Sequence, residues 1–387
     1  MLPLRYHTQN ILLRWRSTLA TIMGVALVVA VYLCVQALAA GLEKSSGNTG
    51  DPRNLMIARK GALSESTSII TRDQYKQIQY LEGVARDADG KPLTSSDVLI
   101  IINLQRTGGQ GSANASLRGV SPNGLLLRSQ VALTEGRWFS PGKREVVTSR
   151  RMAERFDALK IGGRFKAAGQ ELTVVGLFDG QRSAFDSEIW LDCDEARQVF
   201  DRPDYSSVLV RPIADPAATV ALKNLLENDK RLKVKVVREV DYYKEQTRTA
   251  MPIKVLGNFL ATTMSIGAIF AAMNTMYASI GARTREIGTL RVLGFRRRTI
   301  LLGFIVEGVL LALVGGVIGC VLAWPMNGYS TGTISFESFS EVVFDFTITP
   351  QLLLKGIIFS AIVGFIGSLL PAIRAARLPV IAALKSI

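Results

Sequence analysis

The side chains that most often carry out chemistry in proteins are sparse in this sequence. Its 387 residues include one histidine, His7, and three cysteines, too few for a histidine-rich metal site or a disulfide scaffold. A small acidic cluster, Asp192, Asp194 and Glu195, is the remaining candidate for acid–base or metal chemistry. We interpret it as the negatively charged first turn of a helix, where carboxylates are favourable.

Motifs that bind phosphate or activate a nucleophile are also missing from the sequence. No segment matches G-x-x-x-x-G-K-[ST], G-x-S-x-G or H-E-x-x-H. The glycine-rich residues 108–111 lack the lysine and the strand-to-helix context of a phosphate loop. Cys193 is either a reactive thiol or, as we expect, a buried and inert one. We therefore expect a chain that is not an enzyme and that binds no cofactor or metal.

Four long apolar segments dominate the rest of the chain. A helix needs about 20 apolar residues to cross a bilayer. The segments that meet this length are residues 19–40, 256–280, 301–326 and 352–370. The first resembles a signal peptide because Ala37-Leu38-Ala39 could be a cleavage site. However, the apolar core of a signal peptide has about 7–15 residues, and this segment is longer. We expect it to be retained as an anchor, which makes the chain an integral membrane protein with four transmembrane helices.

The distribution of charge predicts an orientation. The sequence has 46 Lys and Arg against 32 Asp and Glu, a net charge of +14. Segment 281–299 has six arginines and one glutamate, whereas segment 327–351 has acids and no base. Basic residues next to spans stay in the cytoplasm. The N-terminal segment 1–18, an amphipathic stretch, and the C-terminal tail 371–387 are also basic. We therefore expect a multi-pass protein of the cell inner (cytoplasmic) membrane with both termini in the cytoplasm. The basic residues flank the membrane lipid, so lipid is an expected partner and nucleic acid is not.

By this topology, residues 41–251 lie outside the cytoplasm, as does loop 327–351. Alternating strand-like and helix-like stretches predict a large mixed α/β domain of two subdomains, one inserted in the other at about residues 116–204. The expected strands are residues 54–58, 98–104, 145–148, 172–178, 188–191, 207–211 and 233–237. The expected helices are residues 71–81, 150–159, 193–200 and 216–226. Residues 107–114 form either a mobile loop or an ordinary hairpin tip. Helical extensions at residues 42–44 and 240–254 are expected to continue the first two spans.

The link between the second and third spans reads as a short amphipathic helix. In 283–298, Ile287, Leu290 and Leu293 share one helical face, and Gly294 ends the helix before a run of arginines. A solvated basic loop is the alternative. The apolar face favours a segment that seats in a groove of a partner.

This link resembles the coupling segment of the MacB/FtsX-type (type VII, mechanotransmission) ABC transporter permeases. The family pattern R-T-R-E-I-G-x-L-R-x-L-G-x-x-R-R fits residues 283–298. The entry into the first span at 14–25, the third span at 307–319 and the ending at 371–384 are similar to the same family. Segments 133–139 and 173–178 resemble its MacB-type periplasmic core domain.

The resemblance implies a division of labour between chains. A dimer of separate cytoplasmic ABC ATPase subunits would bind ATP and Mg, and a second permease subunit would complete a homodimer. A periplasmic adaptor and an outer-membrane channel are further implied partners. The residues that would contact the ATPase are those of the link, namely Arg283, Arg285, Glu286, Ile287, Gly288, Leu290, Arg291, Leu293 and Gly294.

Glu307 is an acid inside the third span, where an unpaired charge is costly. Its candidate partners are Asn274 of the second span and the arginines of the link. We expect an anchoring role rather than a proton relay.

Two functions remain open at this point. One is an exporter or extractor of a drug-like, peptide or lipoprotein substrate, driven by mechanotransmission. The other is a signalling complex that activates cell-wall hydrolases without moving a substrate. The large outer domain, about 210 residues, favours the first.

Overall fold

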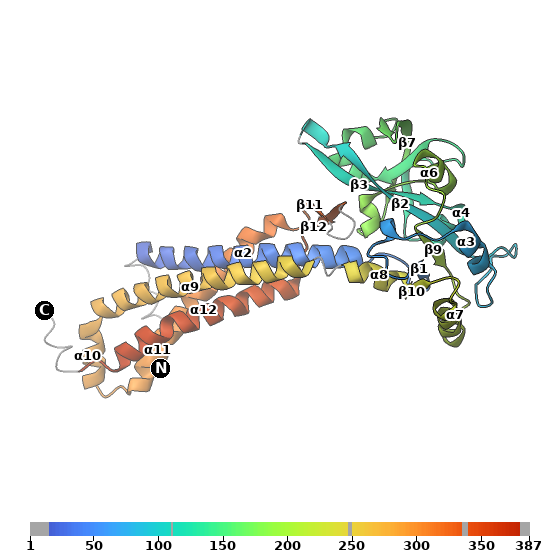
Figure 1. Cartoon of the computed structure of the whole chain (residues 1–387). Coiled ribbons are helices and arrows are strands. Elements are labelled where there is room, and N and C mark those ends of the chain that lie inside the picture. Colours follow the sequence, from blue (N-terminus) through green and yellow to red (C-terminus); the bar gives the residue numbers. More distant parts are fainter. Residues whose placement is uncertain (1–14, 110, 247–249, 335–339, 380–387) are drawn as a thin grey trace. The chain divides into compact units, whose positions relative to one another are not determined.

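The computed structural model describes residues 15–109, 111–246, 250–334 and 340–379 (Figure 1). It divides into two compact units. The helical unit comprises the described residues of Met1–Ala40, Pro252–Tyr329 and Phe346–Ile387; the α/β domain comprises those of Gly41–Met251 and Ser330–Asp345. Most of the expected N-terminal segment 1–18, and residues 380–387 of the expected C-terminal tail, lie outside the described residues.

In the described part of the helical unit, four long α-helices and one short α-helix form the structure. They are α2 (Trp15–Gly47), α9 (Ala250–Ala282), α10 (Thr284–Val292), α11 (Arg297–Ala323) and α12 (Pro350–Ala376). The four long helices contain segments that are long and apolar enough to cross a membrane, with mean hydropathies between 1.6 and 2.5. The four expected spans are therefore confirmed.

Glycines bring α11 and α12 into close contact. A methyl group placed on Gly316 would overlap the side chain of Ser360, and one on Gly364 would overlap Ala312. Helices in lipid gain little from the hydrophobic effect between them, so close backbone approach provides the dispersion contacts that hold them together. Gly316 and Gly364 are thus packing positions between these two spans.

α12 continues through Pro371 to Ala376, beyond the expected end at residue 370. Proline inside a helix removes one hydrogen bond and strains the preceding turn. Here Ala372 and Ala375 are buried in an apolar cluster with Ile300 and Phe304, and this packing holds the last turns in place.

The α/β domain contains one ten-stranded sheet, in the order β10-β1-β9-β2-β3-β8-β5-β7-β4 with β6 paired to β7. Its strands are β1 (Leu55–Arg59), β2 (Thr94–Gln105), β3 (Ser112–Val120), β4 (Ala132–Gly136), β5 (Glu145–Ser149), β6 (Arg164–Ala167), β7 (Gln170–Asp179), β8 (Glu188–Asp192), β9 (Ser207–Val210) and β10 (Val234–Arg238). The pairs β3–β8 and β5–β7 are parallel and the others are antiparallel.

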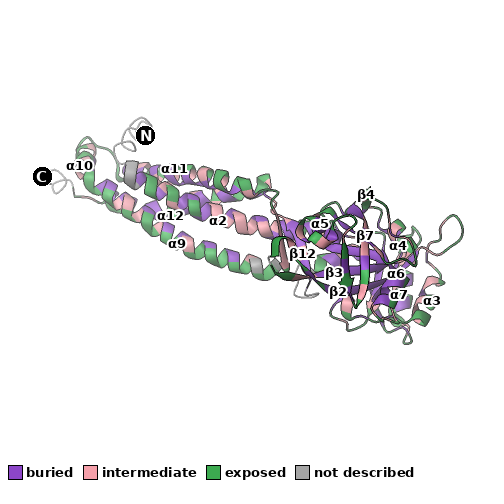
Figure 2. Ribbon diagram, turned by 90° about the horizontal axis from the view of Figure 1, so that it is seen from above, coloured by how far each residue is buried: buried purple, intermediate pink, exposed green. Residues whose placement is uncertain are grey.

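Helices pack against this sheet and enclose two separate apolar cores with it. The helices are α3 (Arg72–Gln79), α4 (Pro122–Leu127), α5 (Arg150–Arg155), α6 (Cys193–Val199), α7 (Pro216–Asn228) and α8 (Glu239–Gln246). One core lies between β10-β1-β9 and helices α3 and α7, and the other between the longer half of the sheet and helices α5 and α6. Figure 2 shows the buried strands of this domain in purple.

Side chains alternate across the sheet, as the two-residue period of a strand requires. In β8, Ile189 and Leu191 enter the larger core, whereas Trp190 joins an aromatic cluster with Phe178 and Phe185 on the other face. Both faces of the sheet are therefore covered at β8, all of whose residues are buried.

All seven expected strands and all four expected helices are present, with shifted ends. β3, β4 and β6 had no counterpart among the expected strands. The segment expected as an inserted subdomain supplies β4 to β8, which continue the common sheet. They share one apolar core with Val98, Ile100, Ile102 and Leu104 of β2. The stretch 107–114 lies at the tip of the β2–β3 hairpin, and its residue 110 is outside the described residues.

The structure describes the two expected helical extensions to different extents. α2 runs on to Gly47, as the sequence predicts. α8 ends at Gln246 and α9 begins at Ala250, with residues 247–249 outside the described part of the chain.

Candidate functional site

The candidate coupling helix α10 ends in a Schellman motif. Gly294 has φ +92°, its N–H donates to the carbonyl of Arg291 at 3.2 Å, and the N–H of Phe295 donates to the carbonyl of Leu290 at 3.1 Å. Glycine takes this left-handed conformation without steric cost. The expected end of the helix at Gly294 is confirmed.

The side chains of α10 divide between the helical unit and solvent. Ile287 is only 2% exposed and packs with Met276 and Phe304, and Gly288 is buried. The expectation that Ile287 shares one outward apolar face with Leu293 is therefore wrong. The helix docks against α9 and α11 through Ile287, which holds it in one orientation.

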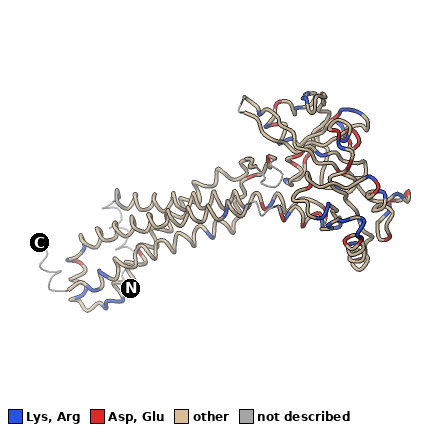
Figure 3. The backbone as a smooth tube through the Cα atoms, viewed as in Figure 1, with Lys and Arg blue, Asp and Glu red and all other residues tan. Residues whose placement is uncertain are grey.

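The outward surface of α10 and the residues after it is mixed in character. Val292 is 62% exposed, Leu293 70% and Phe295 38%, while Arg285 and Glu286 are also exposed. Leu290 and Arg291 are half-buried. Figure 3 shows Lys and Arg gathered at α10 and the start of α11, next to helices that carry few charges. An apolar tip flanked by basic residues is a surface suited to a protein partner.

Arg283, at the break between α9 and α10, pairs with the acid inside the third span. Its Nη1 donates to Oε2 of Glu307 at 3.1 Å, with the two side chains 9% and 5% exposed. Asn274, the other partner considered, is exposed on α9. Removing one member of a buried ion pair typically costs about 3–5 kcal/mol because the other charge is left uncompensated. The pair therefore fixes the start of α10 to α11.

Two further polar contacts join α2 and α9. Nε2 of Gln36 donates to Oδ1 of Asn258 at 2.6 Å, and Oγ1 of Thr21 donates to Oγ1 of Thr275 at 2.8 Å. Sequence reasoning missed them because single polar residues in an apolar helix give no indication of their partner. Such bonds help to set the register of two helices in lipid.

In the α/β domain, the acidic cluster is a helix cap. Oδ2 of Asp192 accepts the N–H of Glu195 at 3.1 Å, and Asp194 lies in the first turn of α6. Cys193 is 3% exposed, and burial raises the pKa of its thiol, which disfavours the reactive thiolate. Among the described residues, no group of three His, Cys, Asp or Glu side chains is arranged to hold a metal ion.

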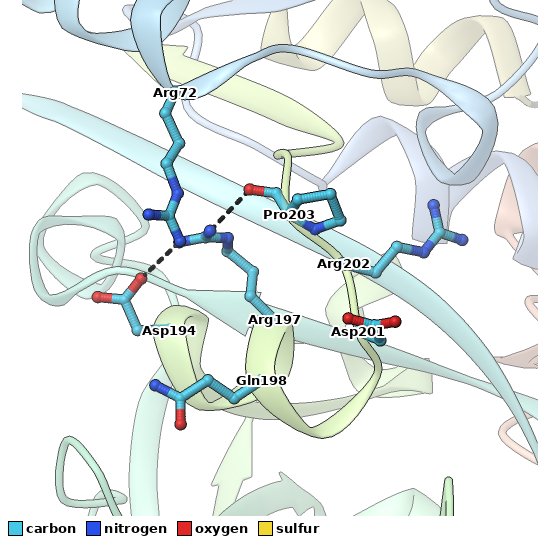
Figure 4. A pocket seen from close by; sticks show the side chains of 7 residues that line it. All are labelled: Arg72, Asp194, Arg197, Gln198, Asp201, Arg202 and Pro203. Carbon is cyan, nitrogen blue, oxygen red and sulfur yellow. Dashed lines mark hydrogen bonds and ion pairs between the residues drawn. The ribbon is translucent and has the colours of Figure 1, made fainter.

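A polar pocket of about 230 Å³ lies beside the end of α6. Figure 4 shows Arg197 between two of the groups that line it. Its Nη1 donates to Oδ1 of Asp194 at 2.9 Å and its Nη2 donates to the carbonyl of Pro203 at 2.6 Å. Its guanidinium also lies 5.0 Å from the ring centroid of Tyr205. We interpret this arginine as a tie between α6 and the loop that follows.

The most extensive polar feature of the domain is a buried charge network. Arg118, 1% exposed, donates to both carboxylate oxygens of Glu65 at 2.5 and 3.0 Å and to both of Glu188 at 2.8 Å. It also lies 3.4 Å from Asp97. Bidentate pairing of this kind specifies orientation as well as providing energy. One arginine thus joins β3, β8, β2 and the loop before α3.

The same network reaches both connections to the membrane helices. Arg128 donates to Asp97 at 2.5 Å and to Oε1 of Glu239 at 3.2 Å. Oε2 of Glu239 accepts the N–H of Asp51 at 2.9 Å and Nδ2 of Asn54 at 2.7 Å. Asp51 follows α2 and Glu239 begins α8, so one carboxylate ties the two ends together.

Burial alone would raise the pKa of Asp97, but the charges of Arg128 and Arg118 outweigh it and hold the pKa below its usual value. The carboxylate therefore stays ionised in the folded domain at neutral pH. Sequence reasoning did not find this network, because its members are far apart in the chain and no local pattern connects them.

Comparison with known families agrees with this architecture. Residues 17–228 match the family model described as MacB-like periplasmic core domain, and residues 258–380 match the one described as FtsX-like permease C-terminal. The chain belongs to the MacB/FtsX-like family of ABC transporter permeases. It is a multi-pass membrane protein, and the main segment of its α/β domain, Gly41–Met251, lies between the first and second spans in the sequence.

Individual relatives cover the chain to different extents. It is 24% identical to the "Uncharacterized ABC transporter permease YknZ" of Bacillus subtilis (strain 168), over 99% of this chain and 98% of that protein. It is 25% identical to the "Macrolide export ATP-binding/permease protein MacB" of Pasteurella multocida (strain Pm70), over 95% of this chain and 58% of that protein. The match to the Escherichia coli protein of the same name, 30% identical, spans 47% of this chain and 30% of that protein.

Two solved structures are also similar to part of the chain. The extracellular domain of YknZ from Gram-positive bacteria is 16% identical, with 48% of this chain and 99% of that chain covered and a TM-score of 0.37. The periplasmic region of MacB from Actinobacillus actinomycetemcomitans is 12% identical, with 51% and 94% covered and a TM-score of 0.38.

Proposed function

We propose that this chain is the membrane subunit of a transporter that couples ATP hydrolysis by a separate cytoplasmic ATPase to movement of the α/β domain outside the cytoplasm. The substrate would be drug-like, a peptide or a lipoprotein, exported or extracted from the outer side. Two copies of the chain would assemble with two ATPase subunits, which bind ATP and Mg. Both termini and α10 would lie in the cytoplasm, and an adaptor and an outer-membrane channel would complete the assembly.

The observation that carries this proposal is the construction of α10. A buried ion pair and Ile287 fix the helix to the spans, while Leu293 and Val292 remain exposed at its end. A helix that is rigid on its inner side and apolar at its outer tip can transmit a push from a partner, because it does not tilt independently of the spans. The basic residues around it agree with a cytoplasmic location.

The α/β domain is suited to receive such a movement. Glu239 ties together the chain that leaves the first span and the chain that leads into the second. Because the buried carboxylate of Glu239 accepts from both Asp51 and Arg128, neither connection is a loose linker. Displacement of either connection would therefore also move the sheet.

The test is co-purification of the chain with its ATPase. Leu293→Asp places a charge on the exposed tip of α10 and is expected to abolish ATPase binding without unfolding the chain. Leu63→Asp, at a leucine 91% exposed in the α/β domain, is the matched control and should bind normally. Equal binding by the two variants would contradict the proposal. A complex that activates a cell-wall hydrolase and stimulates no transport would instead support the signalling alternative.

A further inference from the structure

The loop between the last two membrane helices forms a hairpin that belongs to the α/β domain. Strands β11 (Ser330–Ile334) and β12 (Glu341–Asp345) pair antiparallel, with Ser330 opposite Asp345 and Ile334 opposite Glu341. The residues directly before and after the hairpin, Tyr329 and Phe346, belong to the helical unit. The described ends of the hairpin are therefore joined to the α11 and α12 side of the molecule by single peptide bonds.

Packing attaches β12 to the domain. Val343 is 1% exposed and belongs to the larger apolar core of the sheet. Its N–H donates to Oγ of Ser187 at 2.7 Å, and Ser187 lies in the short helical turn Ala184–Ser187 before β8. A valine buried in this way contributes about 1.5–3 kcal/mol relative to an exposed one. The hairpin is thus part of the folded domain.

Two acidic residues of the hairpin pair with arginines of the domain. Glu341 is 1% exposed and accepts from Nη2 of Arg106 at 2.7 Å and from Arg155. Asp345 accepts two parallel bonds from Arg151, at 3.0 and 2.7 Å. Arg106 follows the end of β2, and the other two arginines lie on α5. The contacts therefore come from two separate elements.

The arrangement fixes the position of the hairpin. A buried carboxylate has lost its water, so separating it from its arginines leaves charges uncompensated on both sides. The paired bonds from Arg151 also demand one relative orientation, since the guanidinium fork is planar. A hairpin held only by Val343 could rotate about its strand axis, whereas the ion pairs at Glu341 and Asp345 prevent this.

We propose that this hairpin is a clip through which the α11–α12 connection moves the α/β domain, a route additional to the connections from α2 and α9. Glu341 is its central positioning residue. The inference rests on the proposed function, because the movement that it transmits would originate at the ATPase.

The test uses the full chain with its ATPase in lipid nanodiscs and follows backbone hydrogen exchange. Glu341→Gln keeps the size of the side chain and removes its charge. It should make exchange at residues 341–345 about tenfold faster, because release of the ion pairs opens the hairpin locally. The exchange difference that ATP and Mg produce in the rest of the α/β domain should fall at least twofold. Binding of the ATPase should be unchanged.

Two further variants sharpen the experiment. Glu135→Gln is the matched control, since Glu135 pairs with Arg150 at an exposed site of the same domain, and it should leave both readouts unchanged. Asp345→Asn removes the less buried acid and should give a smaller change in the same direction. It keeps the test possible if Glu341→Gln does not fold.

Unchanged exchange in the hairpin of both variants would show that no clip exists. Faster exchange with an undiminished response to ATP would show that the clip is not a route of transmission. Failure of the unmodified chain to bind an ATPase would overturn the proposed function itself, while the exchange of the hairpin would still report whether the clip is formed.

Discussion

Glu239 is expected to be essential to the buried network, and Glu239→Ala tests this directly. The side chain accepts from the N–H of Asp51 at 2.9 Å, from Asn54 at 2.7 Å and from Arg128 at 3.2 Å. Its removal leaves a buried guanidinium whose Nη1 already has no hydrogen-bond partner among the described residues. Loss of one partner of a buried ion pair costs about 3–5 kcal/mol.

The assay is the thermal midpoint in detergent, followed by intrinsic tryptophan fluorescence, to which the buried Trp190 of the α/β domain contributes. In a domain of this size, 1 kcal/mol moves the midpoint by about 2–4 °C. The expected decrease is therefore about 6–20 °C. Glu239→Gln retains acceptors for Asp51 and Asn54 but loses the charge facing Arg128, so its midpoint should fall between those of the alanine variant and the unmodified chain.

The matched control is Glu171→Ala. Glu171 pairs with Arg164, and the two side chains are 48% and 69% exposed. Exposed ion pairs contribute little, because water screens both charges in the folded and unfolded states. If Glu239→Ala lowered the midpoint no more than Glu171→Ala, the argument that Glu239 holds the two connections together would be refuted.

Four further predictions concern Glu307, Gly316, Cys193 and Asp97. Glu307→Gln should reduce ATPase coupling severalfold in the assembled complex without changing its pH dependence, and a proton-dependent defect in transport would contradict the anchoring role. Gly316→Leu should prevent stable assembly of the helical unit, whereas Gly267→Leu, where an added Cβ meets nothing within 4 Å, should be tolerated; size-exclusion profiles in detergent would distinguish them. Cys193 should resist a charged maleimide at neutral pH in the folded chain and react after denaturation, as measured by mass spectrometry of its peptide. Since the pKa of Asp97 is lowered by folding, its contribution to stability should be complete at neutral pH and decline as the pH falls below about 4; a midpoint for Asp97→Asn with the same acid dependence as the unmodified chain would exclude this.

Local patterns accounted for most of the fold. The four spans could be predicted because about 20 consecutive apolar residues have few stable alternatives to a membrane helix. The cap at Asp192 and the end of α10 at Gly294 could be predicted because both depend on neighbouring residues only. β4 and β6 were missed because they are short and largely polar, so that the alternation of a strand is weak in them.

The coupling helix shows where local patterns become insufficient. Its amphipathic period correctly indicated a helix but not which neighbours its apolar residues meet. Ile287 lies against the spans, while Leu293 remains exposed. A period of 3.6 residues defines a face and says nothing about what covers it.

The sequence by itself determined the class of the molecule: the number of spans, the size of the intervening domain and the basic link whose pattern resembles a coupling segment. Each of these depends on the kinds of residue present in a continuous stretch. Only the tertiary structure decided which charges meet. Glu307 is paired with Arg283 rather than Asn274, Glu239 joins two connections far apart in the chain, and Glu341 of the hairpin pairs with Arg155, which lies 186 residues earlier. Ion pairing inside a protein depends on distance and burial in three dimensions, and neither quantity is contained in the order of the residues.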